Sequence, residues 1–76
     1  MSFELATTVF KDPFAVERLD DRENDGEERF IIIGAALGGI VLVVIYTERQ
    51  GRIRIISARG ATQYEQDDYF QQGQDA

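Results

Sequence analysis

The chain has 76 residues, with 8 basic and 14 acidic side chains and a net charge of −6, and it contains no cysteine, histidine or tryptophan. This composition excludes a disulfide framework, a zinc site built from cysteine and histidine, and histidine-based catalysis. The acidic balance argues against a simple nucleic-acid coat protein, and 43% hydrophobic residues are too many for a disordered chain. We therefore expect one domain over residues 1–76, with a polar tail at about 71–76 and no metal or cofactor.

The first 28 residues predict a short helix, a weak strand and a loop. Ser2 is a suitable cap for a helix that runs to about Phe10 and that has three residues on one face: Phe3, Ala6 and Phe10. The pair Asp12-Pro13 ends this helix. Residues 14–19 then indicate a weak strand, and residues 20–26 indicate a polar loop.

Residues 30–47 form an uncharged run of eighteen residues, which is long enough to be a transmembrane helix. The run contains Gly34-x-x-x-Gly38, a helix-dimerisation pattern, and its flanks differ in charge. However, eight of its residues are Ile or Val, which favour strands in water, and Gly38-Gly39 is typical of a hairpin turn. We therefore expect strands at 29–36 and 40–48, and we keep a single membrane span as a remote alternative. Strands that are apolar on both faces imply cover by a helix and by a partner chain.

The segment after this run predicts a turn, a further strand and a final helix. Arg49-Gln50-Gly51 is a turn pattern, and the strand that follows covers residues 52–59. Strict alternation in this strand places one set of side chains on one face, namely Ile53, Ile55, Ser57 and Arg59. The other face then carries Arg52, Arg54 and Ile56. Thr62 and Glu65 have the spacing of a capping box, so the final helix runs from about Thr62 to Gln71.

These elements predict an α+β fold. A short N-terminal helix is followed by an antiparallel β-meander of three to four strands and then by a C-terminal helix. Residues 49–64 hold four arginines and no acid, which indicates a basic patch on an acidic body. The plainer interpretation is that these arginines are solvated side chains of a strand and a turn.

Blocks of residues along nearly the whole chain occur in a specific order and spacing. They are Ser2-Phe3-Glu4, Phe10-x-Asp12-Pro13, Asp20-Asp21-Arg22-Glu23, Gly26-Glu27-Glu28-Arg29-Phe30, Arg52-Ile53-Arg54-Ile55-Ile56-Ser57-Ala58-Arg59, Ala61-Thr62, and Glu65 with Tyr69. In these blocks the chain resembles the BrnT family of bacterial type II toxins, which share the RelE-like ribonuclease fold.

The resemblance implies an mRNA endoribonuclease that is neutralised by a small antitoxin with a ribbon-helix-helix DNA-binding domain. It also implies a cytoplasmic protein that acts without a membrane and does not bind DNA by itself. Family members usually begin with a further strand and helix that end in a Lys-His-Gly motif, and we expect this segment to be absent from a chain that begins Met1-Ser2. Without the first strand of the family, one edge of the sheet would be unpaired, and this predicts self-association through residues 30–46.

The final helix of family members is also usually rich in arginine, whereas residues 63–68 here are Gln and acidic residues around one Tyr. The missing positive charge would weaken the binding of RNA. A catalytically weak or inactive member, which acts only by binding other proteins, therefore stays an alternative.

RNA cleavage by attack of a 2′-hydroxyl needs a base, an acid and cations that stabilise the developing charge. Arginine suits the last role because its planar guanidinium grips phosphate with two hydrogen bonds. Arg59, at the end of the last strand, is the first candidate, and Arg54 is the second. Tyr69, Glu65 and Arg29 are candidates for proton transfer or positioning. The plainer interpretations are a core-edge aromatic, a helix cap and an ion-pair partner, respectively.

Overall fold

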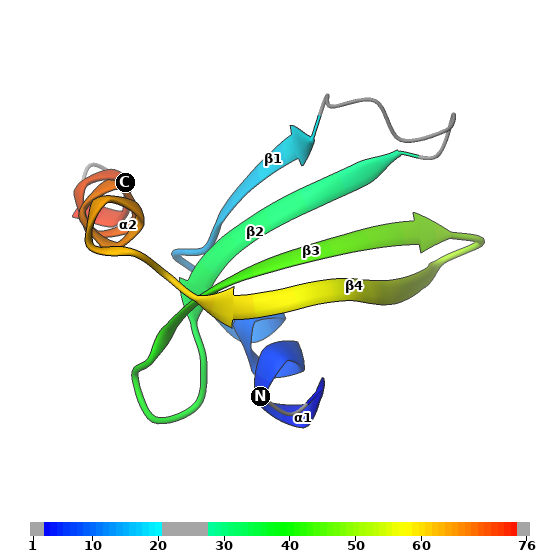
Figure 1. The fold of residues 1–76 in the computed structure, drawn as a ribbon, viewed down its shortest axis with the longest axis horizontal. Helices are drawn as coiled ribbons and strands as arrows, with labels where there is room; N and C mark the ends of the chain where they lie inside the picture. Colours follow the sequence, from blue (N-terminus) through cyan, green and yellow to red (C-terminus); the bar gives the residue numbers. More distant parts are fainter. Residues whose placement is uncertain (1–2, 21–27, 75–76) are drawn as a thin grey trace.

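The computed structural model describes residues 3–20 and 28–74. These residues form a four-stranded antiparallel sheet in the order β1-β2-β3-β4, with one helix below the sheet and another at one end (Figure 1). The elements in chain order are α1 (Phe3–Thr7), the 3-10 helix η1 (Thr8–Lys11), β1 (Val16–Asp20), β2 (Arg29–Ala35), β3 (Val41–Arg49), β4 (Arg52–Gly60) and α2 (Gln63–Gln74). The predicted α+β class and β-meander are confirmed.

The N-terminal helix tightens into a 3-10 turn after Thr7, and this changes which side chains it buries. A 3-10 helix has three residues per turn, and Ala6 and Val9, three residues apart, are fully buried. Phe3, which was expected to lie on one face of the helix with Ala6 and Phe10, is 69% exposed and takes no part in this packing. The proposed cap, Ser2, and the loop residues 21–26 lie outside the described residues, while Asp20 ends β1.

The uncharged run forms β2, β3 and the hairpin turn between them, so the predicted division at Gly38-Gly39 is confirmed. Both glycines have positive φ angles, 93° and 84°, which glycine adopts without steric cost. The membrane-span alternative was wrong, because the run is strand rather than helix. None of the described helices has the length and apolar character needed to cross a membrane.

The two central strands are apolar on both faces, and a helix of the same chain covers part of each face. On the α1 side, the helix and η1 pack on one cluster: Ala6, Val9, Ile32, Ala36, Leu42, Val44 and Tyr46. On the opposite side, Tyr69 of α2 packs on Ile33, Val41 and Val43. Because β2 and β3 are paired with strands on both edges, self-association of this region would need a face of the sheet, and it stays a prediction.

A bulge in β4 changes the faces that the last strand presents. Ser57 lies opposite Ile45, whereas Ile55 lies opposite Tyr46, so Ile56 between them is an extra residue. A bulge of this kind interrupts the alternation of side chains along the strand. The prediction that residues 53, 55, 57 and 59 share a face was therefore wrong. Ile53 and Ile55 lie on the α1 side, and the other face carries Arg52, Arg54, Ile56, Ser57 and Arg59.

Gly34 gives a test of how closely η1 packs on the sheet. A Cβ atom at this position would lie 2.9 Å from Val9 Cγ1 and 3.0 Å from Ala15 Cβ. We therefore expect Gly34→Ala to lower the free energy of unfolding by about 1–3 kcal/mol, because the core must shift to admit the methyl group. Chemical denaturation measures this. The matched control is Gly60→Ala, where a Cβ would meet nothing within 4 Å; equal stabilities for the two variants would contradict the packing described.

Candidate functional site

Arginines gather on the face of the sheet that points away from α1. The register of the strands places six of the eight basic residues of the chain on this face: Arg18, Arg29, Arg49, Arg52, Arg54 and Arg59. We call these six residues the arginine face. Helix α2 lies at one end of it, and the turn between β3 and β4 lies at the other (Figure 1). A chain with a net charge of −6 therefore carries a strongly basic surface.

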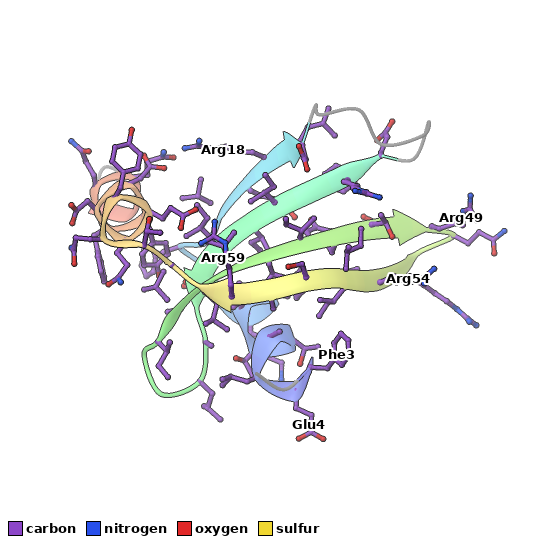
Figure 2. The ribbon with its side chains drawn as sticks, viewed as in Figure 1. Phe3, Glu4, Arg18, Arg49, Arg54 and Arg59 are labelled. Carbon is purple, nitrogen blue, oxygen red and sulfur yellow. The ribbon has the colours of Figure 1, made fainter. Side chains whose placement is uncertain are left out.

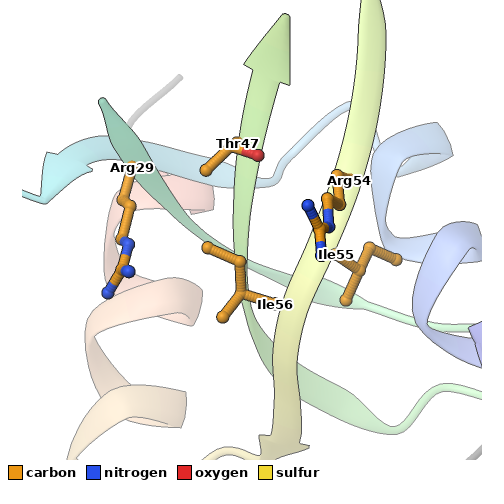
Figure 3. Close-up of a pocket in the computed structure, with 5 residues that line it drawn as sticks. All are labelled: Arg29, Thr47, Arg54, Ile55 and Ile56. Carbon is orange, nitrogen blue, oxygen red and sulfur yellow. The ribbon is translucent and has the colours of Figure 1, made fainter. Parts of the chain in front are cut away.

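A hollow of about 280 Å³ lies on this face, away from α2. It is lined by residues from three neighbouring strands: Arg29, Thr47, Arg54, Ile55 and Ile56. Figure 3 shows Arg29 and Arg54 on either side of Thr47 and Ile56. Strands lie about 4.8 Å apart, so residues on β2 and β4 can grip one group that rests on β3 between them. The hollow thus brings two arginines together on one part of the arginine face, with the buried Thr47 between them.

The guanidinium of Arg29 has unused hydrogen-bonding capacity. Its Nε atom is buried and has no hydrogen-bond partner within the described part of the chain. A buried donor without a partner costs free energy, and an oxyanion would recover that cost. Among the described residues, ion pairs are found at Arg18 and Arg59 and not at the two arginines of the hollow. Arg29 and Arg54 are therefore available to bind an anion.

The two arginines nearest α2 are neutralised by acids of that helix. Arg59 donates to both carboxylate oxygens of Glu65, at 2.7 and 2.8 Å, and it lies between the end of β4 and α2 (Figure 2). Arg18 pairs with Asp68 at 2.7 Å. Glu65 also accepts from the backbone N–H of Thr62, and the Thr62 hydroxyl accepts from the N–H of Glu65. The predicted capping box is therefore confirmed.

This arrangement fixes the protonation of Glu65. The hydrogen bond from Arg59, followed by that from Thr62, lowers the pKa of Glu65 to about 2. The same partner raises the pKa of Arg59. At neutral pH, Glu65 is thus a carboxylate already engaged with two donors, which makes it a weak base and leaves it no proton to donate.

Tyr69 lies on the side of α2 that packs on the sheet, and it does not line the hollow. Its side chain is buried, and its hydroxyl donates to the carboxylate of Asp12. Burial, and then the bond to Asp12, raises the pKa of Tyr69 to about 12. Burial alone would raise the pKa of Asp12, but the hydrogen bonds from Tyr69 and from the N–H groups of Ala35 and Phe14 outweigh it, and the pKa is lowered. Tyr69 therefore anchors α2 to the sheet.

The structure thus divides the five candidate residues into three places. Arg29 and Arg54 share the hollow, Arg59 and Glu65 form an ion pair beside it, and Tyr69 lies in the core. Sequence reasoning missed two residues of this face. Thr47 was hidden at the end of the apolar run, and Asp20, buried opposite Arg29 in the register, was assigned to a loop. Either residue could have been found only if the pairing and register of the strands had been known.

We expect the Glu65–Arg59 pair to make stability depend on pH in acid. A folded-state pKa of about 2 lies below the ordinary value of 4.5, so its contribution is present above pH 4.5 and is lost as the pH falls toward 2. Glu65→Gln keeps an acceptor for the cap but removes the charge, and should cost about 0.5–1 kcal/mol at pH 7 and progressively less as the pH falls toward 2. Urea denaturation across this range measures it, with Glu4→Gln at an exposed position of α1 as control. A cost that does not fall between pH 7 and pH 2 would contradict the ion-pair interpretation.

Tyr69→Phe tests the anchor of α2. The substitution keeps the ring but leaves Asp12 without one donor, so we expect a loss of about 1–3 kcal/mol in the free energy of unfolding. The wild-type protein should also lose this contribution as the pH rises from 10 toward 12, because the folded-state pKa is raised. Tyr64→Phe is the matched control, since Tyr64 is 84% exposed. If both variants were as stable as the wild type, the hydrogen bond would have no structural role.

Comparison with known proteins gives the family of the chain. A search of curated proteins finds no match. The family model described as the ribonuclease toxin BrnT of type II toxin–antitoxin systems matches residues 1–65. This range contains the whole sheet, both arginines of the hollow, and the Arg59–Glu65 pair. Because the match covers most of its length, the chain belongs to the BrnT family of ribonuclease toxins of type II toxin–antitoxin systems.

Proposed function

We propose that the chain is an mRNA endoribonuclease that binds the phosphates of its substrate on the arginine face. The observation that carries this proposal is the hollow in which Arg29 and Arg54 flank Thr47 with no acid among its lining residues. Guanidinium groups bind phosphate oxygens with two hydrogen bonds. Two further arginines of the face, Arg49 and Arg52, continue the basic surface toward the β3–β4 turn and would hold neighbouring phosphates.

The chemistry would be an internal transfer within the RNA. The 2′-hydroxyl oxygen attacks the adjacent phosphorus and passes its proton to a base. The bond from phosphorus to the 5′-oxygen breaks, and that oxygen takes up a proton, leaving a 2′,3′-cyclic phosphate and a 5′-hydroxyl. Arg29 and Arg54 would stabilise the charge on the phosphorane oxygens. Asp20 is buried opposite Arg29 in the register and does not line the hollow, and we propose that it positions Arg29 for catalysis.

One observation favours a catalytically weak member as a second candidate function. Glu65 and Tyr69, the residues selected from the sequence for proton transfer, are engaged by Arg59 and Asp12. Arginine stays protonated at neutral pH and therefore cannot act as a base. In this alternative the arginine face would bind RNA without cleaving it, and Arg59 would only hold α2 in place.

The proposed function includes a partner and a place of action. Membership of a type II toxin–antitoxin family implies a protein antitoxin, and we propose that this antitoxin carries a ribbon-helix-helix DNA-binding domain. The toxin would need that partner to reach DNA. An mRNA substrate would place its action in the cytoplasm.

Arg29→Ala and Arg54→Ala test the phosphate site. We expect each to weaken the binding of a single-stranded RNA oligonucleotide and the double variant to abolish cleavage, because each removes a cation from the hollow. The slope of log K against log salt should fall by about 0.7 for each lost phosphate contact. Fluorescence anisotropy measures binding, and gel analysis of the same RNA measures cleavage. Asp20→Asn should lower cleavage with binding retained.

The matched control is Lys11→Ala, which removes one exposed positive charge from η1 on the opposite side of the sheet. If it weakened binding as much as Arg54→Ala, net charge rather than the hollow would explain the affinity. RNA that is bound but never cut by the wild type would favour the second candidate function. The site would be refuted if cleavage were unaffected by Arg29→Ala, by Arg54→Ala, by the double variant and by Asp20→Asn.

A further inference from the structure

A second hollow, of about 280 Å³, lies on the α1 side of the sheet, where α1 and η1 do not cover the strands. Its apolar lining comes from Leu19, Phe30 and Tyr46, and its acidic lining comes from Glu17 and Glu48. Arg18 also borders it, but the Arg18 guanidinium is paired with Asp68 of α2. We call this hollow the acidic groove.

The floor of the acidic groove is held in place. The ring of Tyr46 stacks on Phe30 with centroids 5.4 Å apart and meets the edge of Phe10 at 5.0 Å. The Tyr46 hydroxyl donates to Glu17, which fixes one acid at the side of the groove. Leu19 is nevertheless 58% exposed, and Ile53, on the same face of β4, is 50% exposed. The groove is therefore a preformed apolar surface that is exposed to solvent.

Charge distinguishes this groove from the arginine face. Within the described strands, the register places Glu17 and Glu48 on the α1 side and no arginine there. An RNA backbone would be repelled by these carboxylates, whereas lysine or arginine side chains would pair with them. An acidic second copy of this chain, with a net charge of −6, is a poor match for the same reason. The occupant that fits is a basic segment with apolar side chains.

We propose that the acidic groove is the docking surface for a basic amphipathic segment of the antitoxin. An apolar side chain of this segment would rest on Leu19 and Phe30, and flanking lysines or arginines would reach Glu17 and Glu48. The proposal depends on the family membership of the chain, which implies a protein antitoxin, and it does not depend on RNA cleavage. The partner would then contact the face opposite to the arginines.

The test uses the full chain and, as its probe, its purified protein antitoxin. Leu19→Ser removes the exposed apolar contact, and Glu48→Lys reverses the charge at the rim. We expect each to raise the Kd measured by isothermal titration calorimetry by about tenfold or more. Both residues are exposed, so the fold should be retained, and the thermal unfolding midpoint of each variant checks this.

The matched controls lie outside the groove. Leu37→Ser alters a leucine that is 75% exposed in the β2–β3 turn, and Glu4→Lys makes the same charge reversal on α1. Both should leave the Kd unchanged. Equal weakening by Glu4→Lys would show that net charge alone attracts the antitoxin and would overturn the proposal. An unchanged Kd for the antitoxin in Leu19→Ser and Glu48→Lys would overturn the proposal as well. The same holds if light scattering shows that Leu19→Ser alters self-association while the Kd for the antitoxin stays unchanged.

A further pair of measurements separates this proposal from the proposed function. Arg29→Ala and Arg54→Ala should leave antitoxin affinity unchanged, and weakening of antitoxin binding in these variants alone would place the antitoxin on the arginine face. Loss of RNA binding in the same variants would test the proposed function of the arginine face and would not bear on the acidic groove.

Discussion

The carboxylate of Asp12 is the point on which the arrangement of the molecule depends. One of its oxygens accepts from the backbone N–H of Phe14 and turns the chain toward β1. The other accepts from the N–H of Ala35 at the end of β2 and from the hydroxyl of Tyr69 in α2. A single short side chain thus joins three segments that are far apart in the sequence. These hydrogen bonds are made to a charged acceptor, and they are therefore stronger than bonds between neutral groups.

The position of α2 decides how much of the arginine face remains open. Tyr69 holds the helix over the apolar end of the sheet, near Ile33 and Val43. From there, Glu65 and Asp68 reach Arg59 and Arg18 and neutralise them. The arginines beyond their reach, including Arg29 and Arg54, keep their charge for a ligand. The acidic composition of α2, which in the sequence argued against RNA binding, therefore affects only one end of the basic surface.

The sheet separates charges that the linear sequence mixes. Successive residues of a strand point to opposite faces of the sheet. In β3, Thr47 therefore lies on the arginine face, whereas Glu48 lies on the side of the acidic groove. The bulge at Ile56 completes the separation, because it moves Arg59 to the face that already carries Arg54. A small domain with a net negative charge can in this way offer one surface to a polyanion and another to a cationic protein partner.

The sequence by itself determined the order and type of nearly every element, because local signals specify them: Gly38-Gly39 for the turn between β2 and β3, and Thr62 with Glu65 for the start of α2. It also pointed to the family through blocks of residues in a fixed order, which the match over residues 1–65 bears out. Arg54 could be selected as a candidate because arginine suits phosphate chemistry, and Arg29 as a candidate for proton transfer or positioning, but their meeting in one hollow could not be predicted.

Only the tertiary structure decided which side chains share a face. Alternation placed Arg59 with Ile55, and an extra residue in β4, which no local pattern marks, reversed that assignment. Tyr69 and Asp12 are 57 residues apart, and their bond depends on how α2 packs on the sheet. The periodicity of a sequence depends only on the residues of that strand or helix. Register, bulges and long-range hydrogen bonds depend instead on the other strands and helices against which the segment packs.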